Sequence, residues 1–141
     1  MIVQGQTTAF KTNLLLGVEN FSGTSPYVYK IALYTALASL DNTTTAYSSV
    51  NEVVGTGYTA GGNVLTPITP LGDTTNNTAY LSFNTVTWSG ASFVTRGALI
   101  YNSTTGAAVA VLNFGNDKTA SGTFTITFPA DTSTSAVIRI S

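Results

Sequence analysis

The C-terminal third of the chain alternates apolar residues with threonine, the pattern of a β-strand that buries one face. Phe124, Ile126 and Phe128 alternate with threonines within residues 123–128. Further short apolar runs, separated by turn-forming residues, are 98–101, 107–114 and 136–140. Strands at intervals of about ten residues are typical of antiparallel sandwiches and barrels. We expect a mainly β fold, a single antiparallel β-sandwich of the jelly-roll or immunoglobulin-like type.

One helix is expected, near the N-terminus. Apolar residues recur at helical spacing within residues 7–18, and they are Phe10, Leu14, Leu15 and Val18. Thr7 or Thr8 can cap its start. With 43% hydrophobic residues in 141, the chain has enough apolar material for one core. We expect one domain over 1–141, with an N-terminal arm and helix in 1–24 and the sandwich in 26–141.

The middle of the chain is expected to hold one clear strand and several connections. Residues 28–35 alternate as a strand does. Ser49 and Glu52 have the spacing of a capping box, which predicts a short helical turn over 49–54. The pattern of residues 80–88 slips near Asn84, which indicates a break or bulge. Residues 115–118 are expected to form a turn between strands.

Charged residues make up only 8% of the chain, against about 25% in ordinary domains. Five basic and six acidic residues give a net charge of −1, so there is no basic footprint for nucleic acid. No apolar run approaches the length of a membrane span, and Met1–Gln6 lacks the positive start of a signal peptide. We therefore expect neither a nucleic-acid nor a membrane partner, and synthesis in a cytoplasm.

The residues that usually carry catalysis are scarce. The chain has no Cys and no His, so thiolate and imidazole chemistry are absent. Ser121 lies near Lys118, but turn chemistry explains both. The six acids are spread along the sequence, and they are Glu19, Asp41, Glu52, Asp73, Asp117 and Asp131. A hydrolase that uses two of them is the enzymatic alternative, but we expect turn acids, no enzyme and no cofactor.

A metal site is weighed in the same way. Asn113, Asn116 and Asp117 carry the oxygen ligands that Ca²⁺ accepts, without the spacing of an EF-hand loop. We expect no metal there.

A glycine-rich segment follows Glu52, with Gly55, Gly57, Tyr58, Gly61 and Gly62. It lacks the Lys-Ser/Thr ending of a phosphate-binding loop. Because charges are so few, our hypothesis is that Arg96, set in an apolar run, pairs with Glu52 and ties this segment to the sheet.

Aromatic residues allow one binding alternative. Trp88 and the seven tyrosines could form a flat platform for a glycan. The competing interpretation places them in the core or in a subunit interface.

Three stretches of the sequence, residues 30–35, 51–62 and 96–101 continued by 110–115, resemble small structural proteins of tailed bacteriophages. The helical lead at 10–15 adds to this resemblance, which spans nearly the whole chain. It implies a place in the virion, as a capsid decoration or cement subunit or as a head or tail accessory subunit. The partners would be the major capsid protein or other virion proteins.

From this resemblance we expect a homo-oligomer, a trimer before other states, that holds a shell together across capsomer junctions. Ile2, Val3 and Phe10 would belong to an N-terminal assembly arm that orders on binding. The alternative is a tail or fibre accessory subunit that binds neighbouring virion proteins or a host glycan.

Overall fold

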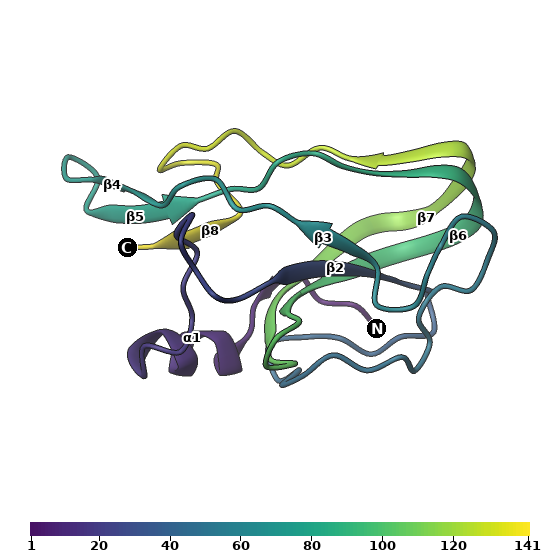
Figure 1. Ribbon diagram of the computed structural model, residues 1–141, viewed down its shortest axis with the longest axis horizontal. Helices are drawn as coiled ribbons and strands as arrows, with labels where there is room; N and C mark the ends of the chain where they lie inside the picture. Colours follow the sequence, from purple (N-terminus) through teal and green to yellow (C-terminus); the bar gives the residue numbers. More distant parts are fainter.

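The computed structural model describes residues 1–141 and is mainly β, with two antiparallel sheets and one short helix (Figure 1). The five-stranded sheet has the order β1-β7-β6-β2-β3, and the three-stranded sheet has the order β4-β5-β8. The elements are β1 (Gly5–Gln6), α1 (Thr8–Leu15), β2 (Tyr29–Tyr34), β3 (Asn63–Leu65), β4 (Leu71–Asp73), β5 (Thr78–Leu81), β6 (Val86–Asn102), β7 (Ala108–Ile126) and β8 (Ile138–Ile140). The expected β class and the N-terminal helix are confirmed.

Helix α1 begins where the sequence predicts and ends three residues early. Thr7 is fully buried, and its hydroxyl accepts the Phe10 N–H at 3.1 Å and donates to the Ala108 carbonyl at 2.9 Å. The cap therefore joins the helix to β7. Phe10 is buried in the core, whereas Leu15 is 91% exposed. The apolar stripe predicted for this helix is thus only partly buried.

Strands β6 and β7 form one long hairpin, which is the largest departure from the sequence prediction. They pair from Val86 opposite Ile126 to Tyr101 opposite Ala108. The segment 115–118, expected to be a connecting turn, lies within β7. The helical turn expected at 49–54 is also wrong, because these residues form an irregular turn with Asn51 at φ 61°. The break expected near Asn84 is confirmed between β5 and β6.

A wide bulge interrupts the hairpin near its middle. Thr95 pairs with Lys118 and Gly97 pairs with Asn113, so four residues of β7 (114–117) lie opposite Arg96 alone. Bulges of this kind bend and twist the strand that carries them. Figure 1 shows the β6–β7 hairpin turning over at the right-hand end of the view, so that one half of the hairpin lies above the other.

The core has two parts, one on each face of β2. A cluster of nineteen buried residues includes Phe10 of α1, Ile100 of the larger sheet, and Leu81 and Ile138 of the smaller sheet. A second cluster of nine includes Ile2 and Tyr34. Strand β2 is therefore covered on both faces, which explains its almost unbroken apolar sequence.

Gly97 is a strict packing position, because a Cβ there would lie 2.5 Å from the Leu112 carbonyl oxygen and 2.9 Å from Ile2 Cδ1. We expect Gly97→Ala to lower the free energy of unfolding by about 1–3 kcal/mol, the usual cost of overpacking. Gly72→Ala is the matched control, since a Cβ there meets nothing within 4 Å. Urea unfolding followed by circular dichroism measures both, and equal midpoints would contradict this account.

Candidate functional site

The glycine-rich segment encloses a buried carboxylate, that of Glu52, which is 6% exposed. One carboxylate oxygen accepts the Tyr47 hydroxyl at 2.6 Å. The other accepts the Tyr58 hydroxyl at 2.6 Å and the Gly61 N–H at 2.7 Å. A buried carboxylate is tolerated where hydrogen bonds replace its lost hydration, and three donors do so here.

Further bonds tie this network to the five-stranded sheet. The Tyr58 hydroxyl also accepts the Leu33 N–H at 2.9 Å, and the Tyr101 hydroxyl donates to the Gly61 carbonyl at 2.8 Å. The rings of Tyr47 and Tyr101 stack with centroids 4.7 Å apart. The network therefore fixes the segment to β2 and β6.

The glycines allow the segment to lie directly against these strands. A Cβ on Gly62 would lie 1.8 Å from the Ile31 carbonyl oxygen, and one on Gly57 would lie 2.6 Å from that of Gly90. Both residues have positive φ, of 73° and 79°. Of the segment's other predicted residues, Tyr58 and Gly61 bind Glu52 directly, and Gly55 packs closely against Ser92 and Phe93.

The phenols around Glu52 are held in their protonated form. Burial, and after it the hydrogen bond to Glu52, raises the pKa of Tyr58 and of Tyr47 well above the ordinary value. Burial followed by the charge of Glu52 raises the pKa of Tyr101. The cluster thus consists of one enclosed carboxylate and neutral phenols, and it holds a loop in place.

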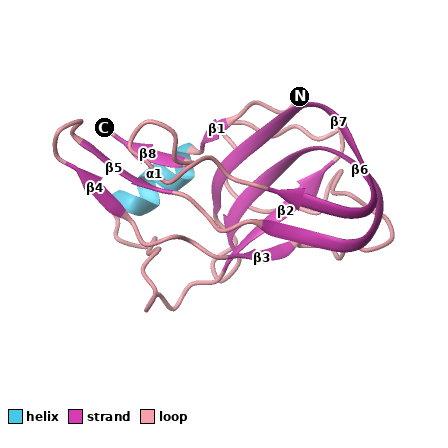
Figure 2. Ribbon diagram, turned by 90° about the horizontal axis from the view of Figure 1, so that it is seen from above, coloured by secondary structure: helices cyan, strands magenta, loops and turns pink.

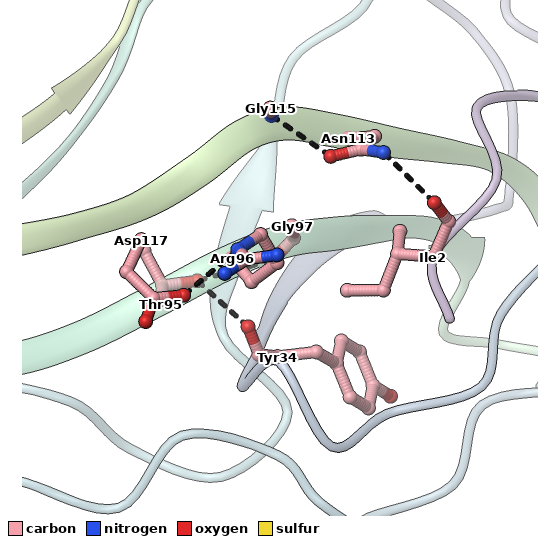
Figure 3. Close-up of polar contacts among 8 residues, drawn as sticks. All are labelled: Ile2, Tyr34, Thr95, Arg96, Gly97, Asn113, Gly115 and Asp117. Carbon is pink, nitrogen blue, oxygen red and sulfur yellow. Dashed lines mark hydrogen bonds and ion pairs between the residues drawn. The ribbon is translucent and has the colours of Figure 1, made fainter.

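The predicted pairing of Arg96 with Glu52 is wrong. Arg96 Nε lies 2.8 Å from Asp117 Oδ1, and the two side chains are 35% and 51% exposed. Arg96 pairs with Asp117 because the bulge places Asp117 across from it (Figure 3). Glu52 meanwhile accepts its three hydrogen bonds from Tyr47, Tyr58 and the Gly61 N–H. An ion pair as exposed as this one contributes little stability.

The same region ties down the N-terminus, as Figure 3 also shows. The Asn113 amide donates to the Ile2 carbonyl at 2.8 Å and accepts the Gly115 N–H at 2.8 Å. Val3 N–H donates to the Leu40 carbonyl at 2.8 Å. Asn113 is thus engaged by the N-terminal segment and Asp117 by Arg96, and both are among the oxygen-bearing residues weighed for Ca²⁺. No group of three or more acidic, Cys or His residues is placed to hold a metal ion.

The expected assembly arm is part of the folded domain. Ile2 is 5% exposed and Phe10 is fully buried, so the hydrophobic effect keeps both in the core. Of the three predicted residues only Val3 reaches the surface, at 46% exposure.

The alternative of a glycan platform at Trp88 is contradicted, and Trp88 lies in the core, as the competing interpretation expects. Trp88 is 2% exposed because the alternation of β6 turns it, together with Val86, into the core. Its ring lies against those of Tyr58 and Phe124, with centroids 6.3 and 5.9 Å away. The flat face needed to bind a sugar is covered by the protein itself.

A second buried carboxylate, that of Glu19, has a hydrogen-bond network that the sequence pattern does not predict. One of its oxygens accepts the Tyr29 hydroxyl at 2.6 Å and the Asn102 amide at 3.2 Å. Its other oxygen is buried without a partner. Burial, and then the bond to Glu19, raises the pKa of Tyr29. The partners of Glu19 lie ten and 83 residues away in the sequence, so no local pattern predicts this network.

One concave feature of the surface was also not predicted. A groove of about 830 Å³ opens between β1, β7 and β8. Its apolar lining consists mainly of half-buried side chains, among them Leu112, Phe114, Phe124, Ile126, Phe128 and Val137. Lys118 and Arg139 lie at its rim, and no acidic side chain lines it. Its chemistry suits an apolar ligand with negative charge.

Comparison with models of known protein families, with curated proteins and with solved structures finds no match to this chain. No helix of the structure has the length and apolarity required to span a membrane.

The Glu52 network predicts a large effect from a small substitution. Glu52→Gln replaces an acceptor oxygen by an amide group that faces hydroxyl and N–H donors. We expect the free energy of unfolding to fall by about 2 kcal/mol or more, the scale of hydrogen bonds to a charged group. Asp117→Asn, which breaks only the exposed ion pair, should cost less than about 1 kcal/mol. Urea titrations of the two variants compare them, and equal losses would refute a special role for Glu52.

Alkaline pH should unfold the protein cooperatively. The pKa values of Tyr29, Tyr34, Tyr47, Tyr58 and Tyr101 are raised in the fold, chiefly by burial. Their contribution to stability is complete below pH about 10, where the phenols are protonated in both states. Above it, each phenol that ionises only when unfolded removes about 1.4 kcal/mol per pH unit.

The measurement is phenolate absorbance near 295 nm as the pH rises. Ionisation of these five phenols should coincide with the loss of near-ultraviolet circular dichroism. If all the phenols ionise while the native dichroism persists, burial does not control them.

Proposed function

We propose that this chain is a structural protein of a tailed-bacteriophage virion, a capsid decoration or cement subunit that binds across capsomer junctions. Two things support the proposal. The first is the resemblance of residues 30–35, 51–62 and 96–101 to such proteins. The second is the surface, which carries few charged side chains and several exposed apolar ones.

The surface is the observation that carries the proposal. Thirteen large apolar side chains are exposed, among them Leu15, Leu37 and Val54 at 91%, 79% and 94%. Against them stand five basic and six acidic residues, of which Glu19 and Glu52 are buried. A surface with so little charge resists association weakly, and exposed apolar side chains gain free energy when a partner covers them. Both properties suit a subunit that works within an assembly.

We also propose that the two sheets form a single β-sandwich, of the jelly-roll or immunoglobulin-like type. The support is the main core cluster, which contains Leu81 and Ile138 of the smaller sheet beside residues of the larger one. A sandwich whose glycine-rich segment is fixed by Glu52 would be a stiff part, suited to bearing load between capsid subunits. A trimer is the oligomer proposed for positions of threefold symmetry on a shell.

The test is the copy number of this chain in purified virions, measured by quantitative mass spectrometry against the major capsid protein. A decoration subunit should give a ratio near one or a simple fraction of it, on the order of hundreds of copies per particle. Roughly a few dozen copies or fewer would instead favour the tail or fibre accessory role. Absence from the particle would refute both roles.

A further inference from the structure

The groove lies beside strand segments of both sheets that have no neighbouring strand on one side. Strand β8 is the last strand of the smaller sheet and pairs only with β5. Strand β7 is next to last in the larger sheet, but its neighbour β1 covers only Ala110 and Val111. Figure 2 shows β1 and β8 side by side, and the Gln6 amide donates to the Arg139 carbonyl across this gap at 3.1 Å. The groove is thus bordered by two strand edges that are largely unpaired.

These edges can bind an additional strand. Residues 124–126 of β7 pair with β6 on one side, and the groove lies on the other. Unpaired N–H and C=O groups along such an edge are a template for an extended peptide. The protein already uses this edge once, because the Gln4 side chain accepts the Asn113 N–H at 3.1 Å, just beyond the residues paired with β1.

The lining of the groove specifies the side chains that such a strand would carry. Phe124, Ile126 and Phe128 alternate along the edge and are only half-buried, and Phe114 and Val137 border the same space. An extended segment with apolar residues at every second position would cover them, since alternate side chains of a strand point to the same face.

The charges at the rim specify the sign of the partner. Lys118 and Arg139 are both exposed there, and they are two of only five basic residues in the chain. No carboxylate side chain lines the groove. A bound segment with acidic residues between its apolar ones would neutralise this rim, whereas a basic segment would be repelled.

A second copy of this chain is poorly suited to supply those acids. Glu19 and Glu52 are buried, and Asp117 is paired with Arg96. Asp41 accepts bonds from Thr43, and Asp73 accepts bonds from Asn76 and Ser133. Asp131, the remaining acid, has one oxygen buried. The two acids nearest in sequence, Asp41 and Glu52, are eleven positions apart, so no segment of a second copy alternates acidic with apolar residues, and a different protein is the better source.

We infer that the groove binds an extended segment of a neighbouring protein, with apolar and acidic residues in alternation, which pairs with the free edges of β7 and β8. This inference rests on the proposed function, which provides such a neighbour in the assembly. It goes beyond that function because it assigns the contact to the groove and to a segment of alternating apolar and acidic residues.

The experiment uses an eight-residue synthetic peptide in which phenylalanine or leucine alternates with glutamate. Isothermal titration calorimetry measures its binding, and amide chemical shifts locate it on the full-length protein. We expect binding at least about tenfold tighter than that of the matched peptide with lysine in place of glutamate. The shifts should concentrate in residues 124–128 and 138–140. A proline at the centre of the peptide should abolish binding, because it removes a donor to the edge.

Protein variants provide the matched controls. Lys118→Glu combined with Arg139→Glu should weaken binding of the glutamate peptide about tenfold or more. Both side chains are exposed, so the fold should persist, and the dichroism spectrum checks it. Lys30→Glu, on β2 and outside the groove, should leave the affinity unchanged. No binding, equal binding of both peptides, or an equal effect of Lys30→Glu would overturn the inference.

Two further measurements separate this inference from the proposed function. If purified shells bind the protein but neither peptide binds, the groove assignment fails and the decoration role stands. If the glutamate peptide binds and shells do not, the groove assignment stands and the decoration role fails. Self-association in sedimentation velocity that Lys118→Glu abolishes would assign the groove to a second copy and overturn the inference.

Discussion

The β6–β7 pairing is interrupted most widely where residues 114–117 lie opposite Arg96 alone, and much of the molecule depends on that interruption. A regular hairpin of this length would be an extended ribbon with two exposed faces. The bulge bends it, so that Phe124, beyond the bulge, and Phe114, the first residue of the bulge, lie with their ring centroids 6.3 Å apart. The same bend leaves the outer edge of β7 beside β8, which creates the groove.

The two buried carboxylates show how a chain with few charges uses them. Glu52 and Glu19 each accept a short hydrogen bond from a tyrosine rather than from a basic residue. A tyrosine brings ring area to the core and a single donor to the acid, so the contact costs less desolvation than a buried ion pair would. The directional bonds also fix which loop lies against the sheet. This arrangement gives specificity to a core that is otherwise apolar and adaptable.

Local pattern is enough to predict some of the elements, such as α1 and β2, and it does not predict the long-range register. The alternation at Phe124–Phe128 and the cap at Thr7 were visible because each depends on neighbours in sequence. Residues 115–118 have the composition of a turn because a bulge and a turn use the same residues, Gly, Asn and Asp. The partner of Arg96 cannot be predicted locally, because only the register of β6 against β7 places Asp117 opposite it. The groove depends on the relative position of two sheets, which no local pattern encodes.

The basic residues at the groove also bear on why free strand edges are tolerated in a protein with so little charge. Lysine at an edge is a common means of preventing a strand from pairing with its own copy, because symmetric pairing brings like charges together. Lys118 and Arg139 would oppose each other in this way if two copies met groove to groove. An acidic segment carries the charge opposite to that of these two side chains, so it is attracted to them. The same two side chains can therefore exclude self-pairing and select a different partner, which is the combination that an ordered assembly of unlike subunits requires.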